Sequence, residues 1–325
     1  MLKFLVTGGA GFIGSNLVEA LLNQNYEVTV LDNLSTGKIS NIQSFLNDIR
    51  FIKGDIQNLE TCYQAVKGMD YVLHQAAIGS VPLSIKDPIQ THLTNVTGTL
   101  NMLVAAKDQG IRKVVLAASC AAYGNSKQLP LVESMPSSPL SPYAASKLVT
   151  ESYASVFSSV YGLPTISLRY FNVFGPKQDP LSQYAAVIPR FISKLISNET
   201  IEIYGDGEQT RDFTYIDNVI QANLNACFAD PISSGKVYNI ACGEQISLNQ
   251  LFEKLCGSMD IHSQPKYKAA QIGDVRHSLA DISLAQAYLN YQPCTNFEQG
   301  LKKVVKWYLE QSGTSTSGYQ AHIQI

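Results

Sequence analysis

Several features that mark other protein classes are missing from this 325-residue sequence. Its six cysteines are widely spaced and form no C-x-x-C pair, so we expect reduced thiols and no metal site. No apolar run is long enough to span a bilayer, and the N-terminal apolar run is too short for a secretory signal. The formal net charge of -2, with basic residues scattered among the acids, offers no basic face to nucleic acid. We therefore expect a cytoplasmic protein that binds neither membrane nor nucleic acid.

Charged residues are sparse, at 15% of the chain against 45% hydrophobic residues, and this balance predicts a compact fold with an extensive core. The first half alternates short, near-continuously apolar runs with helix-like segments, which is typical of parallel strands buried on both faces. The expected strands are 3–7, 27–32, 49–55, 71–77, 113–119 and 163–172. The pattern predicts an α/β fold built on a Rossmann-like, doubly wound parallel sheet.

Beyond residue 172 this rhythm breaks, because three prolines punctuate a loop-rich region. We expect a smaller α/β substrate-binding lobe there. The predicted division gives 1–172 to the dinucleotide-binding domain, with 213–243 crossing back to it. It gives 173–212 and 244–310 to the lobe, and 311–325 to a flexible tail of small and polar residues.

A glycine-rich segment, TGGAGFIG, connects the first expected strand to the first expected helix. Its glycines, Gly8, Gly11 and Gly14, permit a tight turn, a close approach of backbone to a pyrophosphate, and packing of the helix on the sheet. The helix N-terminus adds N–H groups and a partial positive charge. The alternative is an ordinary strand-to-helix turn, but the strand before and the helix after favour a dinucleotide site.

Two acidic residues end expected strands. Asp32 ends the second strand, where a carboxylate can accept hydrogen bonds from the adenosine ribose and would repel a 2'-phosphate, so NAD is favoured over NADP. Alternatively, Asp32 and Asn33 only cap the turn. Asp55 ends the third strand and is a candidate for the adenine edge or, equally, a turn acid.

Residues 141–147 read SPYAASK, which places Tyr143 and Lys147 at i and i+4 on one face of a helix. A tyrosine has a pKa of about 10 in water, and it becomes a base only where positive charge stabilises its phenolate. Lys147 and an oxidised nicotinamide would both supply such charge. Without the glycine loop upstream, an unremarkable surface pair would be the better interpretation.

Together, TGGAGFIG, Asp32, Y-x-x-x-K, RYFNVFG and RDFTYIDN resemble the extended short-chain dehydrogenase/reductase family of nucleotide-sugar enzymes. The chain is most similar to the bacterial UDP-N-acetylglucosamine 4-epimerases, from Leu2 to about Tyr308. The resemblance implies reversible C4 epimerisation of UDP-N-acetylglucosamine through a 4-keto intermediate with NAD, within polysaccharide biosynthesis, by a homodimer paired through two helices of the first domain. A 4-epimerase of UDP-glucose or of a UDP-uronate is the alternative, and a non-catalytic dinucleotide sensor is a remote one.

The resemblance also assigns roles to residues. The serine four positions before the tyrosine of a Y-G pair is Ser119, which would pass a proton between the sugar O4 and Tyr143. Cys120 and Ala121 follow where related 4,6-dehydratases carry an Asp-Glu pair, so reversible oxidation at one carbon is favoured. The implied catalytic residues are Ser119, Tyr143 and Lys147. The implied cofactor-binding residues are Gly8, Gly11, Phe12, Ile13, Gly14, Asp32, Asn33, Asp55, Ile56, Ala76, Ala77, Asn95, Tyr143, Lys147 and Tyr170.

The implied substrate-binding residues lie mostly in the second half of the chain: Ser80, Ser119, Tyr143, Asn172, Ala186, Val187, Pro189, Ile203, Tyr204, Arg211, Arg276 and Ser278. Arg211 can instead pair with Asp206 or Asp212, and Asn95 can be only a helix cap.

Two positions in the second half bear on the substrate. Gln271 stands where the family often has an arginine, so either Arg276 or another group substitutes, or UDP-sugar affinity is weaker. Ser278 aligns with a gatekeeper position, where a tyrosine in some relatives excludes an N-acetyl group. A serine leaves that space open, unless Ser278 is an ordinary loop residue.

Overall fold

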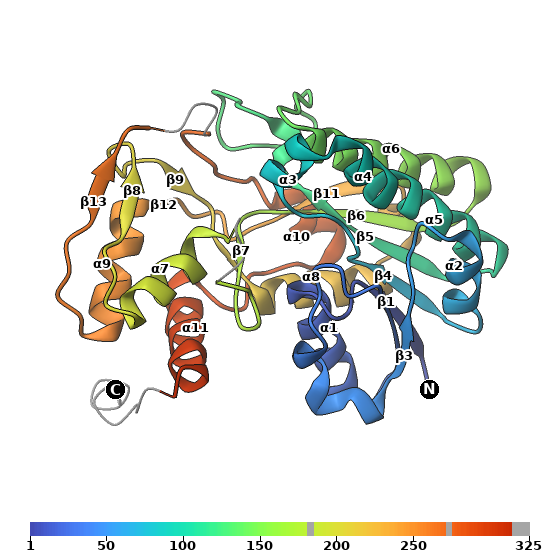
Figure 1. Cartoon of the computed structure of the whole chain (residues 1–325). Coiled ribbons are helices and arrows are strands. Elements are labelled where there is room, and N and C mark those ends of the chain that lie inside the picture. The colour runs from blue at the N-terminus through green and yellow to red at the C-terminus, as the bar shows by residue number, and fades with distance from the viewer. Residues whose placement is uncertain (181–184, 271–274, 314–325) are drawn as a thin grey trace.

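The computed structural model describes residues 1–180, 185–270 and 275–313. Its largest element is a seven-stranded parallel sheet, drawn in Figure 1. In spatial order the strands are β11 (Lys236–Ile240), β6 (Thr165–Tyr170), β5 (Lys113–Ser119), β4 (Tyr71–His74), β1 (Lys3–Thr7), β2 (Glu27–Asp32) and β3 (Arg50–Lys53). The order of the strands along the chain reverses between β1 and β4, which opens a crevice at their carboxyl ends. The predicted α/β, Rossmann-like fold is confirmed.

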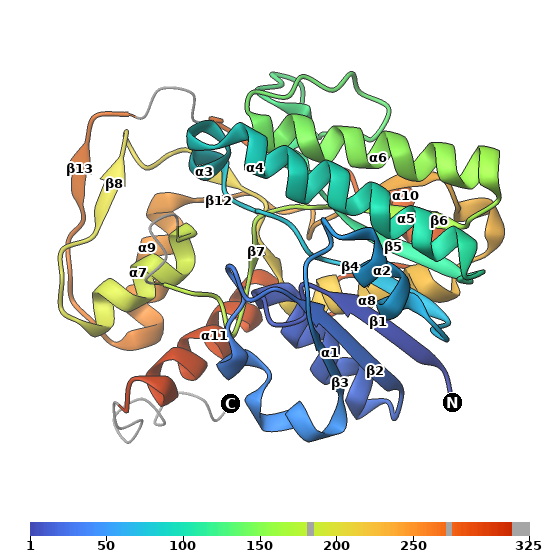
Figure 2. The ribbon, with the colours of Figure 1, turned by 45° about the vertical axis from the view of Figure 1, so that its right-hand side comes forward.

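Helices cover both faces of this sheet (Figures 1 and 2). One face packs on α1 (Phe12–Asn23), α8 (Ile216–Phe228) and α10 (Ser283–Leu289), and the other on α2 (Leu59–Val66), α5 (Gly98–Asp108) and α6 (Pro142–Tyr161). Because side chains alternate along a strand, Phe4 and Val6 of β1 enter one core and Leu5 enters the other. Burial on both faces explains why these strands are almost continuously apolar.

The approach to α5 is irregular. The short helices α3 (Val81–Lys86) and α4 (Pro88–His92) are followed by a π-helical segment, Leu93–Thr97, that runs directly into α5. Isolated π-turns of this kind are common at functional sites.

A second group of elements lies beside the sheet, on the left in Figure 1. It contains α7 (Val187–Ile196), α9 (Leu248–Met259), α11 (Phe297–Gln311) and three short strand pairs. The pairs are β7 (Val173–Phe174) with β10 (Thr214–Tyr215), β8 (Glu202–Tyr204) with β13 (Lys266–Lys268), and β9 (Thr210–Arg211) with β12 (Ile246–Ser247).

The chain leaves the sheet after β6 and returns to it through β11, which pairs with β6 along its whole length. The domain boundaries given above stay a prediction. Helix α11 runs one residue into the segment expected to be a flexible tail, and residues 314–325 lie outside the described residues. Among the helices of the described ranges, none has both the length and the apolar character needed to cross a membrane.

Candidate active site

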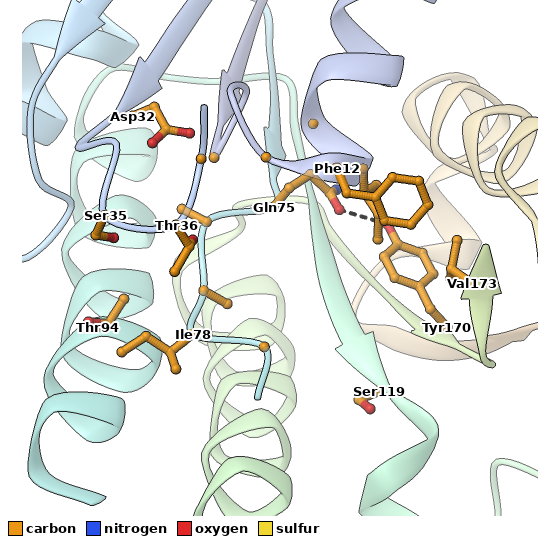
Figure 3. Close-up of a pocket in the computed structure, with 18 of the residues that line it drawn as sticks. Phe12, Asp32, Ser35, Thr36, Gln75, Ile78, Thr94, Ser119, Tyr170 and Val173 are labelled. Atoms are coloured by element: carbon orange, nitrogen blue, oxygen red, sulfur yellow. Dashed lines mark hydrogen bonds between the residues drawn. The ribbon is translucent and has the colours of Figure 1, made fainter. Parts of the chain in front are cut away.

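A cavity of about 490 Å³ lies at the carboxyl ends of the central strands (Figure 3). It occupies the crevice between β1 and β4, where open α/β sheets bind their ligands. The structure brings together in its wall most of the residues predicted for cofactor and catalysis: Gly8, Gly11, Phe12, Ile13, Gly14, Asp32, Asn33, Ile56, Ala76, Ala77, Ser119, Tyr143, Tyr170, Asn172 and Ala186.

The glycine-rich loop forms one wall and tolerates no side chain at two positions. Gly8 has a φ of +67°, and a Cβ there would lie 2.8 Å from the backbone of Ala76. A Cβ on Gly14 would lie 2.1 Å from the carbonyl oxygen of Gly8. The N-terminus of α1 has no side-chain cap and no acid in its first turn, so its positive end is left for an anion. The loop therefore fits the pyrophosphate of a dinucleotide.

Asp32 caps the turn after β2, and its position also leaves it open to the ribose role considered for it. Its Oδ2 accepts a hydrogen bond from the backbone N–H of Ala10 at 2.9 Å, and its Oδ1 accepts one from Leu34 at 2.8 Å. The carboxylate thus ties the glycine loop to the turn after β2, and it also lines the cavity (Figure 3). Its remaining lone pairs are available to ribose hydroxyls. Asp55 instead accepts from the side chain of Asn33 at 2.8 Å and does not appear in the cavity wall.

Of the three predicted catalytic residues, Ser119 and Tyr143 line the same wall of the first cavity, whereas Lys147 is not among the residues of its described wall. Ser119 ends β5, and Tyr143 lies in the first turn of α6. Ser141 caps the N-terminus of this helix, because its Oγ accepts a hydrogen bond from the backbone N–H of Ala144. Lys147, one turn further on, is buried and donates from Nζ to the carbonyl oxygen of Ala117 at 2.7 Å.

Burial dominates the electrostatics of these groups. Burial raises the pKa of Tyr143, and the nearby Ser119 hydroxyl opposes this shift only in part. Burial also lowers the pKa of Lys147 to about 8, against the attraction of Glu151. The chain by itself therefore favours the neutral phenol, so the phenolate expected from the sequence requires further positive charge beside Tyr143.

Three other predicted residues lie in or near the first cavity, and only Tyr170 is part of its described wall. Asn95 lies within the π-helical segment and is 1% exposed, so it is not a helix cap; it accepts from the backbone of Ile78 and donates to Ser146. Tyr170 donates from its hydroxyl to Gln75 at 3.2 Å, the dashed line in Figure 3. Ser80 caps α3 through the backbone of Leu83, outside the cavity wall as described.

A second cavity of about 280 Å³ continues from the first, because Asn172, Val173 and Ala186 line both. Three further predicted residues line it: Val187, Tyr204 and Arg211. The cleft is thus one path in two parts, with glycine loop and Tyr143 in the first part and Arg211 in the second.

Two predicted substrate residues have side chains directed elsewhere. Ile203 is fully buried in the core, because side chains alternate along β8 and its neighbours Glu202 and Tyr204 face the cavity. Pro189 is also buried, on the core side of α7. Within the described ranges, neither side chain lines a cavity wall.

Arg276 and Ser278 stand apart from both cavities as described. Arg276 forms an exposed, bidentate ion pair with Asp206, at 2.8 Å for both contacts. The sequence offered Asp206 as a partner for Arg211. In the structure the carboxylate of Asp206 pairs with the guanidinium of Arg276. Ser278 is 6% exposed, and its N–H donates to the carbonyl oxygen of Thr210 at 3.2 Å. Gln271 lies outside the described residues.

Sequence reasoning missed several residues of the walls. Those of the first cavity include Ser35, Thr36, Gly37, Gln75, Ile78, Gly79, Thr94, Cys120 and Gln178, and those of the second include Arg190, Glu202 and Gln209. Most of them flank a predicted position. For example, Ser35, Thr36 and Gly37 begin three residues after Asp32. Gln178 carries no local signal, because it reaches the cavity through the long connection after β7.

Comparison with known proteins agrees with this geometry. Residues 4–241 match the NAD dependent epimerase/dehydratase family. The chain belongs to this family. A UDP-glucose 4-epimerase of Mycolicibacterium smegmatis is 35% identical over 315 residues, covering 96% of this chain and 100% of that relative.

Solved structures of this family have the same fold. The UDP-N-acetylglucosamine 4-epimerase of Methanobrevibacter ruminantium is 41% identical, with a TM-score of 0.91 over 95% of this chain and 99% of that one. The UDP-glucose 4-epimerase of Thermotoga maritima is 36% identical, with a TM-score of 0.91 over 96% and 100%. NAD is accordingly the cofactor, and the glycine loop, Asp32 and the wall at Ala76 are suited to hold it.

The charge of Asp32 yields a prediction about the cofactor. Because this carboxylate would repel a 2'-phosphate, the dinucleotide released by denaturing the purified protein should be NAD. Asp32→Ser should lower the NAD content, whereas Asp48→Ser, at an exposed site, should not. Enzymatic cycling assays of the supernatant measure both nucleotides, and a protein that releases only NADP would overturn the role given to Asp32.

Proposed function

We propose that this chain is a UDP-sugar 4-epimerase that interconverts UDP-N-acetylglucosamine and UDP-N-acetylgalactosamine. The observation that carries the proposal is the continuous cleft, in which Ser119 and Tyr143 share a wall with the glycine loop and Arg211 lines the far part. Such a cleft suits a nucleotide sugar, with the sugar beside Tyr143 and the diphosphate toward Arg211. A guanidinium matches a diphosphate because it donates two parallel, charge-assisted hydrogen bonds.

The residues beside Ser119 support epimerisation over the related eliminations and decarboxylations. Cys120 and Ala121 follow Ser119 and bring no carboxylate to the reacting carbons. Burial raises the pKa of the Cys120 thiol to about 11, so this neighbour is not a base near neutral pH either. Reversible oxidation at a single carbon needs only the acid/base pair that is present.

The chemistry then divides among a few groups. The glycine loop and Asp32 would hold NAD, which would supply the reversible hydride acceptor for C4. Tyr143 accepts the proton of the 4-hydroxyl, directly or through Ser119, and gives it back after the 4-keto sugar has turned about its diphosphate bonds. Lys147, one helical turn from Tyr143, is the positively charged group expected to assist the phenol once the cofactor is bound, and Arg211 keeps the diphosphate anchored while the sugar turns.

The sugar itself is the finer part of the proposal. An N-acetyl group is favoured by the similarity to the Methanobrevibacter ruminantium enzyme. The gatekeeper alignment of Ser278 points the same way, although Ser278 stands apart from both described cavities. UDP-glucose is the alternative, supported by the similarity to the Mycolicibacterium smegmatis and Thermotoga maritima enzymes. The choice depends on how much space the segment around Ser278 leaves beside the 2-substituent.

The homodimer implied by the resemblance stays a prediction. The exposed apolar side chains of Ile89 on α4, and of Val156 and Val160 on α6, support it. They lie on the two neighbouring helices that would form the interface.

Removing the phenolic hydroxyl should abolish most turnover. We expect Tyr143→Phe to reduce kcat by ~10² to 10⁴-fold with NAD still bound, because the acid/base group is lost and the ring is kept. Ser119→Ala should also be severe, whereas Tyr153→Phe, in the same helix but outside the cavity walls described, should be neutral. Steady-state assays with UDP-N-acetylglucosamine measure these effects, and near-normal kcat in Tyr143→Phe would refute the proton-transfer scheme.

If the gatekeeper alignment of Ser278 holds, a larger side chain there should change the preference between sugars. Proton NMR of the wild-type protein with UDP-N-acetylglucosamine, without added cofactor, should reveal UDP-N-acetylgalactosamine. Ser278→Tyr should remove this activity and keep or improve UDP-glucose turnover, because overpacking a preformed site costs ~1 to 3 kcal/mol. Ser44→Tyr, at an exposed site, is the control. If Ser278→Tyr leaves the ratio of kcat/KM for UDP-N-acetylglucosamine to that for UDP-glucose unchanged, Ser278 does not contact the sugar.

A further inference from the structure

His74 is a buried titratable residue that the proposed chemistry does not use. It ends β4 and is 4% exposed. Its Nδ1 lies 2.8 Å from Oγ1 of Thr7, and its Nε2 lies 3.0 Å from Oγ1 of Thr99. Thr7 is the last residue of β1, directly before Gly8, and Thr99 lies in the first turn of α5. The imidazole therefore joins the strand that carries the glycine loop to the helix that follows the π-helical segment.

The surroundings of His74 fix which nitrogen carries its proton. The hydroxyl of Thr99 donates its only proton to the carbonyl oxygen of Asn95 at 2.5 Å, so Thr99 can only accept from Nε2 of His74. A neutral imidazole protonated at Nε2 has a bare Nδ1, which accepts the proton of Thr7. The ring thus receives a hydrogen bond on one side and donates one on the other.

The ring stays neutral for two physical reasons. Burial lowers the pKa of His74 to about 3, and repulsion from Lys147 on α6 is the second, smaller cause. The side chains that contact its two nitrogens, from β1 and α5, are uncharged threonines. An imidazolium would make Nδ1 a donor as well and reverse the hydrogen bond to Thr7.

The hydrogen bonds continue beyond Thr7 toward the cofactor. Its Oγ1 accepts from the N–H of Ala76 at 3.2 Å. Ala76 lines the first cavity and is the residue whose backbone leaves no space for a side chain on Gly8. The Nδ1 side of His74 therefore fixes the wall that faces the glycine loop.

The hydrogen bonds beyond Thr99 lead to the catalytic helix. Thr99 holds the carbonyl of Asn95, and Asn95 donates from Nδ2 to Oγ of Ser146 at 2.9 Å. Ser146 in turn donates to the carbonyl oxygen of Tyr143 at 2.7 Å. The Nε2 side of His74 is therefore linked, through three hydrogen-bonded residues, to the backbone of the proposed base.

We propose that His74 is a positioning residue whose two nitrogens serve different ends: the Nδ1 acceptor sets the cofactor wall at Ala76, and the Nε2 donor sets Tyr143. The catalytic half of this statement rests on the proposed function of Tyr143. The cofactor half does not depend on which sugar reacts.

The tautomer can be measured in the unmodified protein. In the NAD-loaded protein with ¹⁵N-labelled histidine, His74 should give a bare Nδ1 and a protonated Nε2, unchanged between pH 5 and 9. The chain has five histidines, so the spectrum of His74→Gln identifies the signal. A protonated Nδ1, or titration within this range, would overturn the proposal without any reference to activity.

Two substitutions separate the two sides of the ring. In His74→Asn the amide oxygen can replace Nδ1, so NAD content should persist after gel filtration while kcat falls about 10-fold or more. In His74→Gln the amide N–H can replace Nε2, so kcat at saturating added NAD should stay within about twofold while NAD is lost on filtration. KM for the UDP-sugar should change little in both, because the second cavity is formed by other elements. His262→Gln, at an exposed histidine, is the control.

The outcomes decide between a positioning role and simple core packing. Equal loss of NAD and kcat in both variants, or no loss in either, would contradict separate roles for the two nitrogens. If a variant does not fold, by circular dichroism and thermal melting, the tautomer measurement alone decides, with the His74 signal assigned by substituting the other four histidines one at a time. If the tautomer and the NAD pattern hold while no UDP-sugar is converted, the cofactor half stands and the proposed function fails.

Discussion

The structure depends on one close approach, between the glycine loop after β1 and the backbone after β4. Gly8 adopts a φ of +67° and leaves no space for a Cβ against Ala76, and Gly14 leaves none against Gly8. This close approach directs the positive end of α1 toward the crevice where the strand order reverses. The cofactor wall, the position of Asp32 and the path toward Tyr143 all follow from it.

Burial is the second constraint, and it acts in opposite directions on the two ionisable groups of the α6 face. It raises the pKa of Tyr143 and lowers that of Lys147, so both groups are driven toward their neutral forms. A site poised in this way responds to charge brought by a ligand, because little solvent screens it. The buried groups around this site, such as Thr7, His74 and Asn95, are uncharged and hydrogen-bonded, so burying them costs less free energy than burying charged groups would.

Much of the fold could be predicted from local sequence. The apolar runs at 3–7, 27–32 and 113–119 coincide with β1, β2 and β5, because strands buried on both faces need apolar side chains throughout. The runs at 49–55 and 71–77 were too long by two or three residues at their carboxyl ends. After β4 the chain leaves the sheet to form the cavity wall, where the apolar Ala76 and Ala77 follow. The strand β3 ends before Gly54 and Asp55.

The site was less predictable where tertiary contacts decide. The glycine loop, Asp32 and the Tyr143 helix lie at element ends that sequence patterns mark. Ile203 was assigned to the nucleotide pocket although alternation along β8 turns it into the core, and the ion pair of Arg276 with Asp206 depends on a contact between distant segments. Gln75 and Gln178 reach the cavity only through packing of separate elements, which no local pattern encodes.

If C4 is oxidised and reduced within one cleft, the same hydride must leave the sugar and return to it. The most direct measurement uses UDP-N-acetylglucosamine that carries deuterium at C4, in ordinary water and without added cofactor. The account predicts that both sugars at equilibrium keep deuterium at C4, because the same hydride leaves and returns. Replacement of that deuterium by solvent hydrogen during epimerisation would contradict it.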